Sequence, residues 1–259
     1  MNSYTVFAEF YDNLTRNVGY QERADYFHRL LQLYGNGGHL LLDLACGTGT
    51  LSVEMSGKGY EVIGVDASYD MLAIAREKAE QKGRDILFLC QKMQHLDLYG
   101  TVDVVVCSLD SINHVTKPED VQKIFQRVSL FLNEGGLFVF DANTIYKHQV
   151  ILGNNTFVYD MDTVFCVWQN SYEEKGHLVK IQLDFFSREG DAYYRTGESI
   201  RERAYSTQEL CQWLKDAGLE LVSVYDENSM EPPKEKSQRL VYVAKKHWRQ
   251  EDLDKIKEK

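Results

Sequence analysis

The sequence lacks the features that mark membrane, disulfide-stabilised and zinc-binding proteins. No apolar stretch approaches the roughly 18 residues that a membrane-spanning helix needs. The N-terminus carries acidic residues early and no long apolar core, unlike a signal peptide. The five cysteines are odd in number and form no CxxC pair, which argues against a disulfide framework or a zinc knuckle. We therefore expect a soluble cytoplasmic protein without a bound metal.

Basic residues are scarce relative to acidic ones. The chain has 29 Lys and Arg against 39 Asp and Glu, which gives a formal net charge of −10 at pH 7. A surface that binds a nucleic-acid duplex usually needs a basic stripe, so this balance disfavours DNA as a partner. It leaves open a tRNA substrate bound through a local basic patch. The hydrophobic fraction of 44% is that of an ordinary globular protein.

Apolar runs and helical patterns alternate through the first half of the chain. Five short, almost wholly apolar runs occupy residues 40–44, 61–65, 86–90, 102–107 and 137–141. Helical patterns lie between them at residues 50–57, 69–82 and 118–133, the last one stopped by "NEGG". This alternation predicts an α/β fold with a parallel sheet and right-handed crossovers. Ahead of it, residues 4–34 predict two helices, with glycines from Gly35 onward ending the second.

The pattern changes after Asn143. Residues 157–206 hold alternating, aromatic-rich runs separated by "EEKG" and "REGD", which predicts an antiparallel meander. Helical spacing returns at Thr207, a candidate N-cap, and stops at Gly218. Two last apolar runs, 219–225 and 239–244, precede a charged tail.

A glycine turn and an isolated acid follow the first two apolar runs. "DLACGTGT" spans Asp43 to Thr50, and Asp66 ends the next run, 17 residues after Gly49. Glycines let a ligand approach the backbone closely, and a carboxylate at the neighbouring strand end can accept hydrogen bonds from a ribose diol. The pair therefore predicts a nucleoside site. Ser52 replaces the third glycine of the dinucleotide fingerprint, and Asp43 would repel a pyrophosphate, so a cationic ligand such as S-adenosylmethionine is favoured over NAD.

Together the motifs resemble those of the class I S-adenosylmethionine-dependent methyltransferases. "DLACGTGT" matches the first motif, with Ala45 at the family's first glycine position, and "VIGVDASYDML", "LFLCQKMQHLDL" and "DVVVCSLDSINHV" resemble the next three. The N-terminal "YTVFAEFYDNLT" and the inserted strands are similar to a bacterial group with a helical cap and a β lid. The resemblance implies a Rossmann-like seven-stranded, mostly parallel sheet from residues 1–144 and 207–245. A small antiparallel β lid would occupy 145–206, and a tail 246–259.

The resemblance also implies a cofactor site for S-adenosylmethionine. The expected contacts are Tyr11, Tyr20, Asp43, Ala45, Cys46, Gly47, Gly49, Asp66, Ala67, Ser68, Met71, Gln91, Lys92, Met93, Leu109 and Asp110. Asp66 would bind the ribose, with Ser68 and Met71 near the adenine. Lys92 stands where the family often has an Asp that accepts from the adenine amino group, and a lysine offers no acceptor. Adenine recognition would then use the backbone near Met93 or the amide oxygen of Gln91 or Gln94, with Lys92 solvated.

The sequence identifies the residues of the methyl-transfer step less clearly than those of the cofactor site. The protein must align a nucleophile and exclude water, and it needs a base only if the nucleophile is protonated. His114 and Asp110 are the catalytic candidates, although a loop histidine is often structural and Asp110 could instead cap a helix or line the methionine pocket. Asp141 is a candidate substrate contact or turn residue. Arg201 and Arg203 fit a solvated strand face better than an anion site.

The leading hypothesis is a methyltransferase that acts on a small molecule under an aromatic lid. The sequence holds no NPPY tetrad for amino-group methylation of adenine or glutamine, and no Pro-Cys nucleophile for cytosine C5. Three alternatives stay open: a tRNA- or protein-directed methyltransferase, a nicotinamide oxidoreductase, and a non-catalytic S-adenosylmethionine-binding protein.

Overall fold

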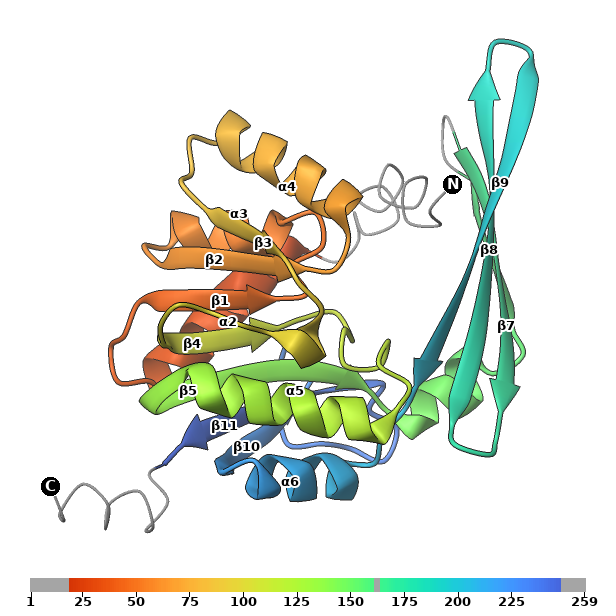
Figure 1. Cartoon of the computed structure of the whole chain (residues 1–259). Coiled ribbons are helices and arrows are strands. Elements are labelled where there is room, and N and C mark those ends of the chain that lie inside the picture. The colour runs from red at the N-terminus through yellow and green to blue at the C-terminus, as the bar shows by residue number, and fades with distance from the viewer. Residues whose placement is uncertain (1–18, 161–163, 248–259) are drawn as a thin grey trace, which may run out of the picture.

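The computed structural model describes residues 19–160 and 164–247, which form two separate β-sheets with helices around the larger one (Figure 1). The larger sheet has seven strands in the order β10-β11-β5-β4-β1-β2-β3. Its strands are β1 (Leu40–Leu44), β2 (Glu61–Asp66), β3 (Leu87–Cys90), β4 (Val102–Cys107), β5 (Leu132–Asn143), β10 (Leu219–Asp226) and β11 (Arg239–Lys246). Only β11 runs antiparallel to its neighbours. This confirms the predicted Rossmann-like, mostly parallel sheet.

Helices cover both faces of this sheet, which explains why its strands are apolar throughout. The helices are α2 (Tyr20–Tyr34), α3 (Thr50–Gly57), α4 (Tyr69–Gln81), α5 (Pro118–Phe131) and α6 (Thr207–Asp216). Successive side chains of a strand point to opposite faces. Leu42 therefore joins the core beneath α5 and α6, while Leu41 joins the core beneath α2 and α3 (Figure 1).

Two element ends differ from the sequence prediction. The "NEGG" segment lies inside β5 and is not a helix stop, since α5 already ends at Phe131. A Cβ on Gly136 would sit 2.8 Å from the Asp103 carbonyl oxygen, so glycine lets this irregular part of β5 lie against β4. The predicted N-cap Thr207 is also wrong. Ser206 caps α6 through a reciprocal capping box with Glu209.

The second sheet is inserted between β5 and α6 and confirms the predicted antiparallel meander. Its order is β6 (Thr156–Asp160), β7 (Val164–Glu173), β8 (Leu178–Glu189) and β9 (Ala192–Arg203). We call this four-stranded sheet the lid. It stands beside the carboxyl ends of the central strands (Figure 1) and is entered through a π-helical turn, η3 (Lys147–Leu152), that the sequence did not predict. The Arg203 backbone N–H donates to the Asn113 carbonyl (2.8 Å), joining β9 to the loop after β4.

The topology brings several carboxyl strand ends to one edge. The chain order reverses at β1, which pairs with β2 on one side and β4 on the other. Ligands of open α/β sheets bind outside the carboxyl ends of the strands at such a reversal. The predicted site residues that follow β1, β2 and β4 therefore converge at this edge. Within the described residues, no helix is both long and apolar enough to span a membrane.

Candidate functional site

The turn after β1 has the backbone conformation that its glycines predict. Ala45, Gly47 and Gly49 have φ angles of 64°, 54° and 71°. Gly49 cannot be replaced without strain, because a Cβ there would lie 2.8 Å from the Cβ of Ala75 in α4. Ala45 adopts the left-handed region that costs an L-residue about 1 kcal/mol. The turn opens directly onto the N-terminus of α3, where backbone N–H groups face the ligand edge.

Asp66 joins the turns that follow β1 and β2. Its carboxylate accepts from the Gly47 N–H (2.9 Å) and from the Ser68 N–H (2.9 Å). Burial raises the pKa of Asp66, while these N–H donors oppose the rise. Each carboxylate oxygen retains a lone pair for a further donor. Asp66 is thus held in place by the protein and can still accept hydrogen bonds from a diol.

Residues 67–71 form the start of α4 beside Asp66. The Ser68 hydroxyl accepts from the Met71 N–H (3.3 Å) and caps the helix. Ala67 is exposed, while Met71 is buried. On the other side of the turn, the Cys46 N–H donates to the Val65 carbonyl (2.9 Å). These contacts place the residues expected to surround the nucleoside next to one another.

Asp43 is buried beneath the glycine turn. It is only 1% exposed, and the hydroxyl of fully buried Ser52 donates to its carboxylate (2.5 Å). Burial raises the pKa of Asp43 to about 7, and the neighbouring charge of Asp66 adds to the rise. Asp43 therefore lies beneath the turn and offers almost no surface for direct contact with a ligand. Ser52 is its hydrogen-bond donor. In the sequence, Ser52 stands out only because it replaces the third glycine of the dinucleotide fingerprint.

Asp43→Asn is expected to flatten the pH dependence of stability. The unfolded-chain pKa of Asp is about 3.9, and the folded-state pKa is about 7. The folded protein therefore holds this proton more tightly, so its free energy of unfolding falls as pH rises from about 4 to about 7 and levels off above that. Asn cannot ionise, so the variant should lose less stability than the wild type between pH 5 and pH 8.

Urea denaturation at these two pH values measures the effect, which is on the order of a few kcal/mol. Asp85→Asn, at an exposed carboxylate, is the matched control. Parallel losses of stability in the wild type and Asp43→Asn would show that Asp43 titrates normally.

The segment after β3 bears on adenine recognition. Lys92 is exposed, and its carbonyl accepts from the His95 N–H (2.8 Å) at the start of η2 (Met93–His95). The Gln91 side chain is engaged with Asp97: its amide nitrogen donates to the carbonyl (3.0 Å) and its amide oxygen accepts from the N–H (2.8 Å). Of the expected acceptors, the half-buried segment Met93–Gln94 therefore remains the candidate for hydrogen bonding to the adenine.

Leu109 and Asp110 form a tight turn after β4. Both have positive φ angles, 56° and 52°. Their N–H groups donate to the buried carboxylate of Asp141 at the end of β5, at 2.9 Å and 2.6 Å. Asp141, which the sequence left as a substrate contact or a turn residue, is therefore the acceptor that fixes this turn.

The Asp110 carboxylate belongs to a buried ion network. We define this network as Arg23, Asp110, Asp141, Glu227 and Arg239. Arg239 lies 3.0 Å from Asp110, 3.0 Å from Glu227 and 3.6 Å from Asp141. Arg23 lies 2.9 Å from Asp141 and 2.5 Å from Glu227.

The network decides the chemistry open to Asp110. Although burial alone would raise the pKa of Asp110, the charges of Arg239 and Lys147 lower it far below its usual range. The Asn143 amide also donates to this carboxylate. A carboxylate held in this way is a weak base, so the geometry favours a positioning role over a catalytic one. Sequence reasoning missed Arg23 and Arg239. Arg23 interrupts the apolar stripe of a helix and Arg239 begins an apolar strand, so each is a charge where a buried residue is expected.

His114, in the loop after β4, lies beside the lid. Its side chain is 41% exposed and its Nε2 lies 3.7 Å from Glu202 on β9. Glu202 also lies 3.2 Å from Nε2 of His148, a fully buried residue of η3. Arg201 points to solvent, and Arg203 donates to the Thr116 carbonyl (3.4 Å). The lid thus places Glu202 beside His114, and sequence reasoning missed this glutamate by examining the arginines on either side of it.

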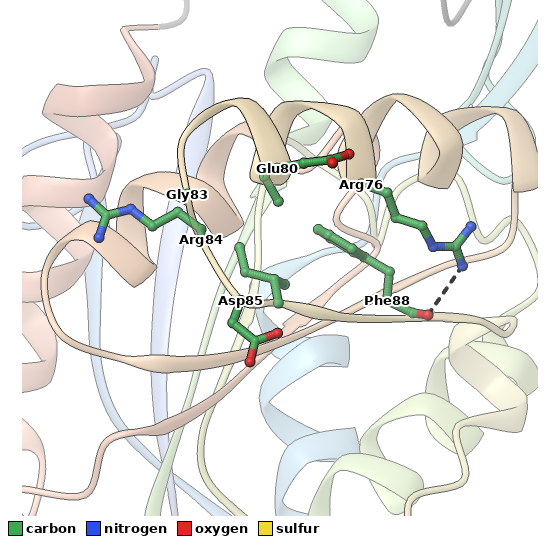
Figure 2. A pocket seen from close by; sticks show the side chains of 8 residues that line it. Arg76, Glu80, Gly83, Arg84, Asp85 and Phe88 are labelled. Carbon is green, nitrogen blue, oxygen red and sulfur yellow. Dashed lines mark hydrogen bonds between the residues drawn. The ribbon is translucent and has the colours of Figure 1, made fainter.

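The remaining expected residues are Tyr20 and Tyr11, and a surface pocket lies apart from the site. Tyr20 begins α2 and packs against the core beneath that helix, and Tyr11 lies outside the described residues. Figure 2 shows an open surface pocket between α4 and the amino end of β3, where Arg76 donates to the Phe88 carbonyl (3.4 Å). It lies at the edge of the sheet opposite Asp66 and is no part of the candidate site.

The chain is similar in sequence and in structure to known methyltransferases. The model of the methyltransferase domain family matches residues 41–136. A protein from Geobacillus sp. (strain WCH70) that is named as a methyltransferase is 34% identical over 246 residues, covering 94% of this chain and 100% of that protein. An S-adenosylmethionine-dependent methyltransferase of known structure from Clostridium acetobutylicum ATCC 824 is 35% identical, with a TM-score of 0.87 over 95% of this chain and 100% of that one. The sugar N-methyltransferase KedS8 from Streptoalloteichus sp ATCC 53650 shares the fold at 18% identity, with a TM-score of 0.76 over 91% of each chain.

Proposed function

Because the chain belongs to the class I S-adenosylmethionine-dependent methyltransferases, we propose that it transfers the methyl group of this cofactor to a small molecule held beneath the lid. The supporting observation is the contact between lid and sheet. Glu202 of β9 lies 3.7 Å from Nε2 of His114 in the loop after β4, and the lid stands beside the carboxyl ends of the central strands (Figure 1). The lid therefore adjoins the edge where the cofactor binds.

The residues at this edge fit the cofactor. Gly49 lets the turn after β1 pack directly against Ala75 of α4, which holds the turn at this edge. Asp66 is oriented by two backbone donors and would accept the ribose hydroxyls, while residues 67–71 and 93–94 would flank the adenine. The buried charge of Asp43 favours the cationic methionine end. When bound, S-adenosylmethionine supplies a methyl group activated by its sulfonium.

The chain's own contribution is then to position the acceptor and exclude water. Buried lid residues such as Leu183 and Phe185 would cover the acceptor, and positioning alone can account for several kcal/mol of the barrier. His114 is exposed at the junction and would take a proton from an acceptor that needs to lose one. Asp110 would hold the turn after β4.

A small acceptor suits this arrangement better than a macromolecule. The net charge of −10 opposes binding of tRNA, and the inner face of the lid is mainly apolar. KedS8, which shares the fold, is named for methylation of a sugar. We also place the reaction in the cytoplasm, where the five free thiols of the chain would persist.

Transfer of a labelled methyl group tests the proposal. The purified protein would be incubated with methyl-labelled S-adenosylmethionine and a bacterial cell extract, which is then divided into small molecules, RNA and protein. We expect the label in the small-molecule fraction, and none there with Asp66→Ala. Label in tRNA or protein would favour the macromolecular alternatives. Cofactor binding without transfer to any fraction would favour a non-catalytic binding protein.

A further inference from the structure

We propose that the lid selects an amine: the carboxylates of Glu198 and Glu202 form the binding site for the positively charged amino group of an otherwise apolar substrate. This inference rests on the proposed function, because it names the class of small molecule that the lid holds. It is carried by two buried acids on one strand and by a carboxylate oxygen, Oε2 of Glu198, that has no hydrogen-bond partner in the described part of the chain.

The two glutamates share the inner face of the lid. They are four residues apart on β9, so both side chains point to the same side of the sheet. Glu198 is 4% exposed and Glu202 is 5% exposed. Their partners across the strand pair are Leu183 and Val179 of β8, which are also buried. Two acids therefore stand in an otherwise apolar wall.

Glu198 is buried, and one of its carboxylate oxygens has no partner among the described residues. Its Oε2 atom accepts no hydrogen bond, and among residues 19–160 and 164–247 no Lys, Arg or His nitrogen forms an ion pair with its carboxylate. Burying an unpaired carboxylate costs several kcal/mol, so such a group stays protonated or binds a cation. Burial accordingly raises the pKa of Glu198 to about 7. A bound ammonium group would stabilise its ionised form.

The charged groups near the two glutamates are two histidines, two basic side chains and Asp110. Glu202 faces His114 and His148, and His114 also lies near Glu198. The fixed cations nearby, Arg239 and Lys147, are engaged elsewhere. Arg239 pairs within the buried ion network, and Lys147 donates to the Asn143 side chain (2.9 Å). Asp110 adds a third acid near His114.

The surroundings of the glutamates define the rest of the ligand. Val179, Ile181, Leu183 and Phe185 of β8 form an apolar strip beside them. An amino group at the carboxylates would therefore leave the body of the substrate against apolar side chains. His114, which is 41% exposed, lies between the loop after β4 and this part of the lid. An alkyl- or arylalkylamine matches both parts.

Binding of a matched amine and alcohol tests the inference. The protein would first be saturated with S-adenosylhomocysteine, then titrated calorimetrically with 2-phenylethylamine and with 2-phenylethanol. We expect the amine to bind the wild type roughly 10-fold to 100-fold more tightly than the alcohol, as a desolvated charge pair should. Glu198→Gln should abolish this preference while leaving the affinity for S-adenosylhomocysteine unchanged. Glu220→Gln, on the exposed side of β10, should keep it.

The outcomes separate this inference from the proposed function. If S-adenosylhomocysteine binds but the amine shows no advantage over the alcohol, or neither binds, the amine site is wrong and the cofactor assignment stands. If S-adenosylhomocysteine itself does not bind, the proposed function fails first. Should Glu198→Gln not fold, Glu202→Gln gives the same comparison, and an amine preference retained in that variant would overturn the site.

Discussion

Asp66→Ala is expected to weaken binding of S-adenosylhomocysteine by roughly 30-fold to 700-fold while leaving the protein folded. Loss of two hydrogen bonds that the ribose hydroxyls donate to the carboxylate corresponds to about 2–4 kcal/mol, and each 1.4 kcal/mol is about tenfold in affinity. The structure adds a second reason. The same carboxylate accepts from Gly47 and Ser68, so its removal also loosens the two turns that face the cofactor.

Calorimetric titration measures this effect, and circular dichroism checks the fold. Asp85→Ala is the matched control, because it removes an exposed carboxylate from the amino end of β3, at the opposite edge of the sheet. It should bind S-adenosylhomocysteine as the wild type does. Unchanged affinity in Asp66→Ala would remove Asp66 from the cofactor site.

Arg239→Met should destabilise the protein by about 3–5 kcal/mol, because it removes one partner of buried ion pairs. Methionine preserves much of the apolar volume but leaves the carboxylates of Asp110, Asp141 and Glu227 without a guanidinium that contacts all three. Arg23 still reaches Asp141 and Glu227 but has no ion pair with Asp110. Asp110 should thus carry the largest part of the loss.

Urea denaturation of Arg239→Met beside Arg195→Met measures the difference. Arg195 forms an exposed ion pair with Asp184 on the lid, and such pairs contribute at most about 1 kcal/mol. The lowered pKa of Asp110 gives the wild type stability that is present above the unfolded-chain pKa of about 3.9 and lost as pH falls below it. Arg239→Met should weaken this loss in acid. Equal effects of the two substitutions would mean that the network does not stabilise the fold.

The nucleotide-facing half of the site follows from local sequence. Gly47, Gly49 and Asp66 are set by strand ends and turns within about one βαβ unit, so their spacing is enough to bring them together. The alternation of apolar runs and helical patterns likewise predicts the sheet, because each run is buried on both faces. The lid was predictable as a meander for a similar reason: its strands follow one another along the chain.

The remaining contacts depend on segments far apart in the chain. Arg23 and Glu227 meet although 204 residues separate them, and nothing in the surroundings of either residue predicts the other. The inward direction of Glu198 and Glu202 depends on strand register, which a shift of one residue would invert. Ser206 was missed as a helix cap because the adjacent Thr207 has the same capping chemistry.

The central claim is that the carboxyl edge of β1, β2 and β4 binds S-adenosylmethionine. Calorimetric titration of the wild-type protein with S-adenosylmethionine, S-adenosylhomocysteine and NAD, side by side, tests it most directly. The structure predicts saturable one-to-one binding of the first two ligands and none of NAD, because Asp43 and Ser52 stand where a dinucleotide site needs a neutral residue and a glycine. Binding of NAD alone would contradict this account of the site.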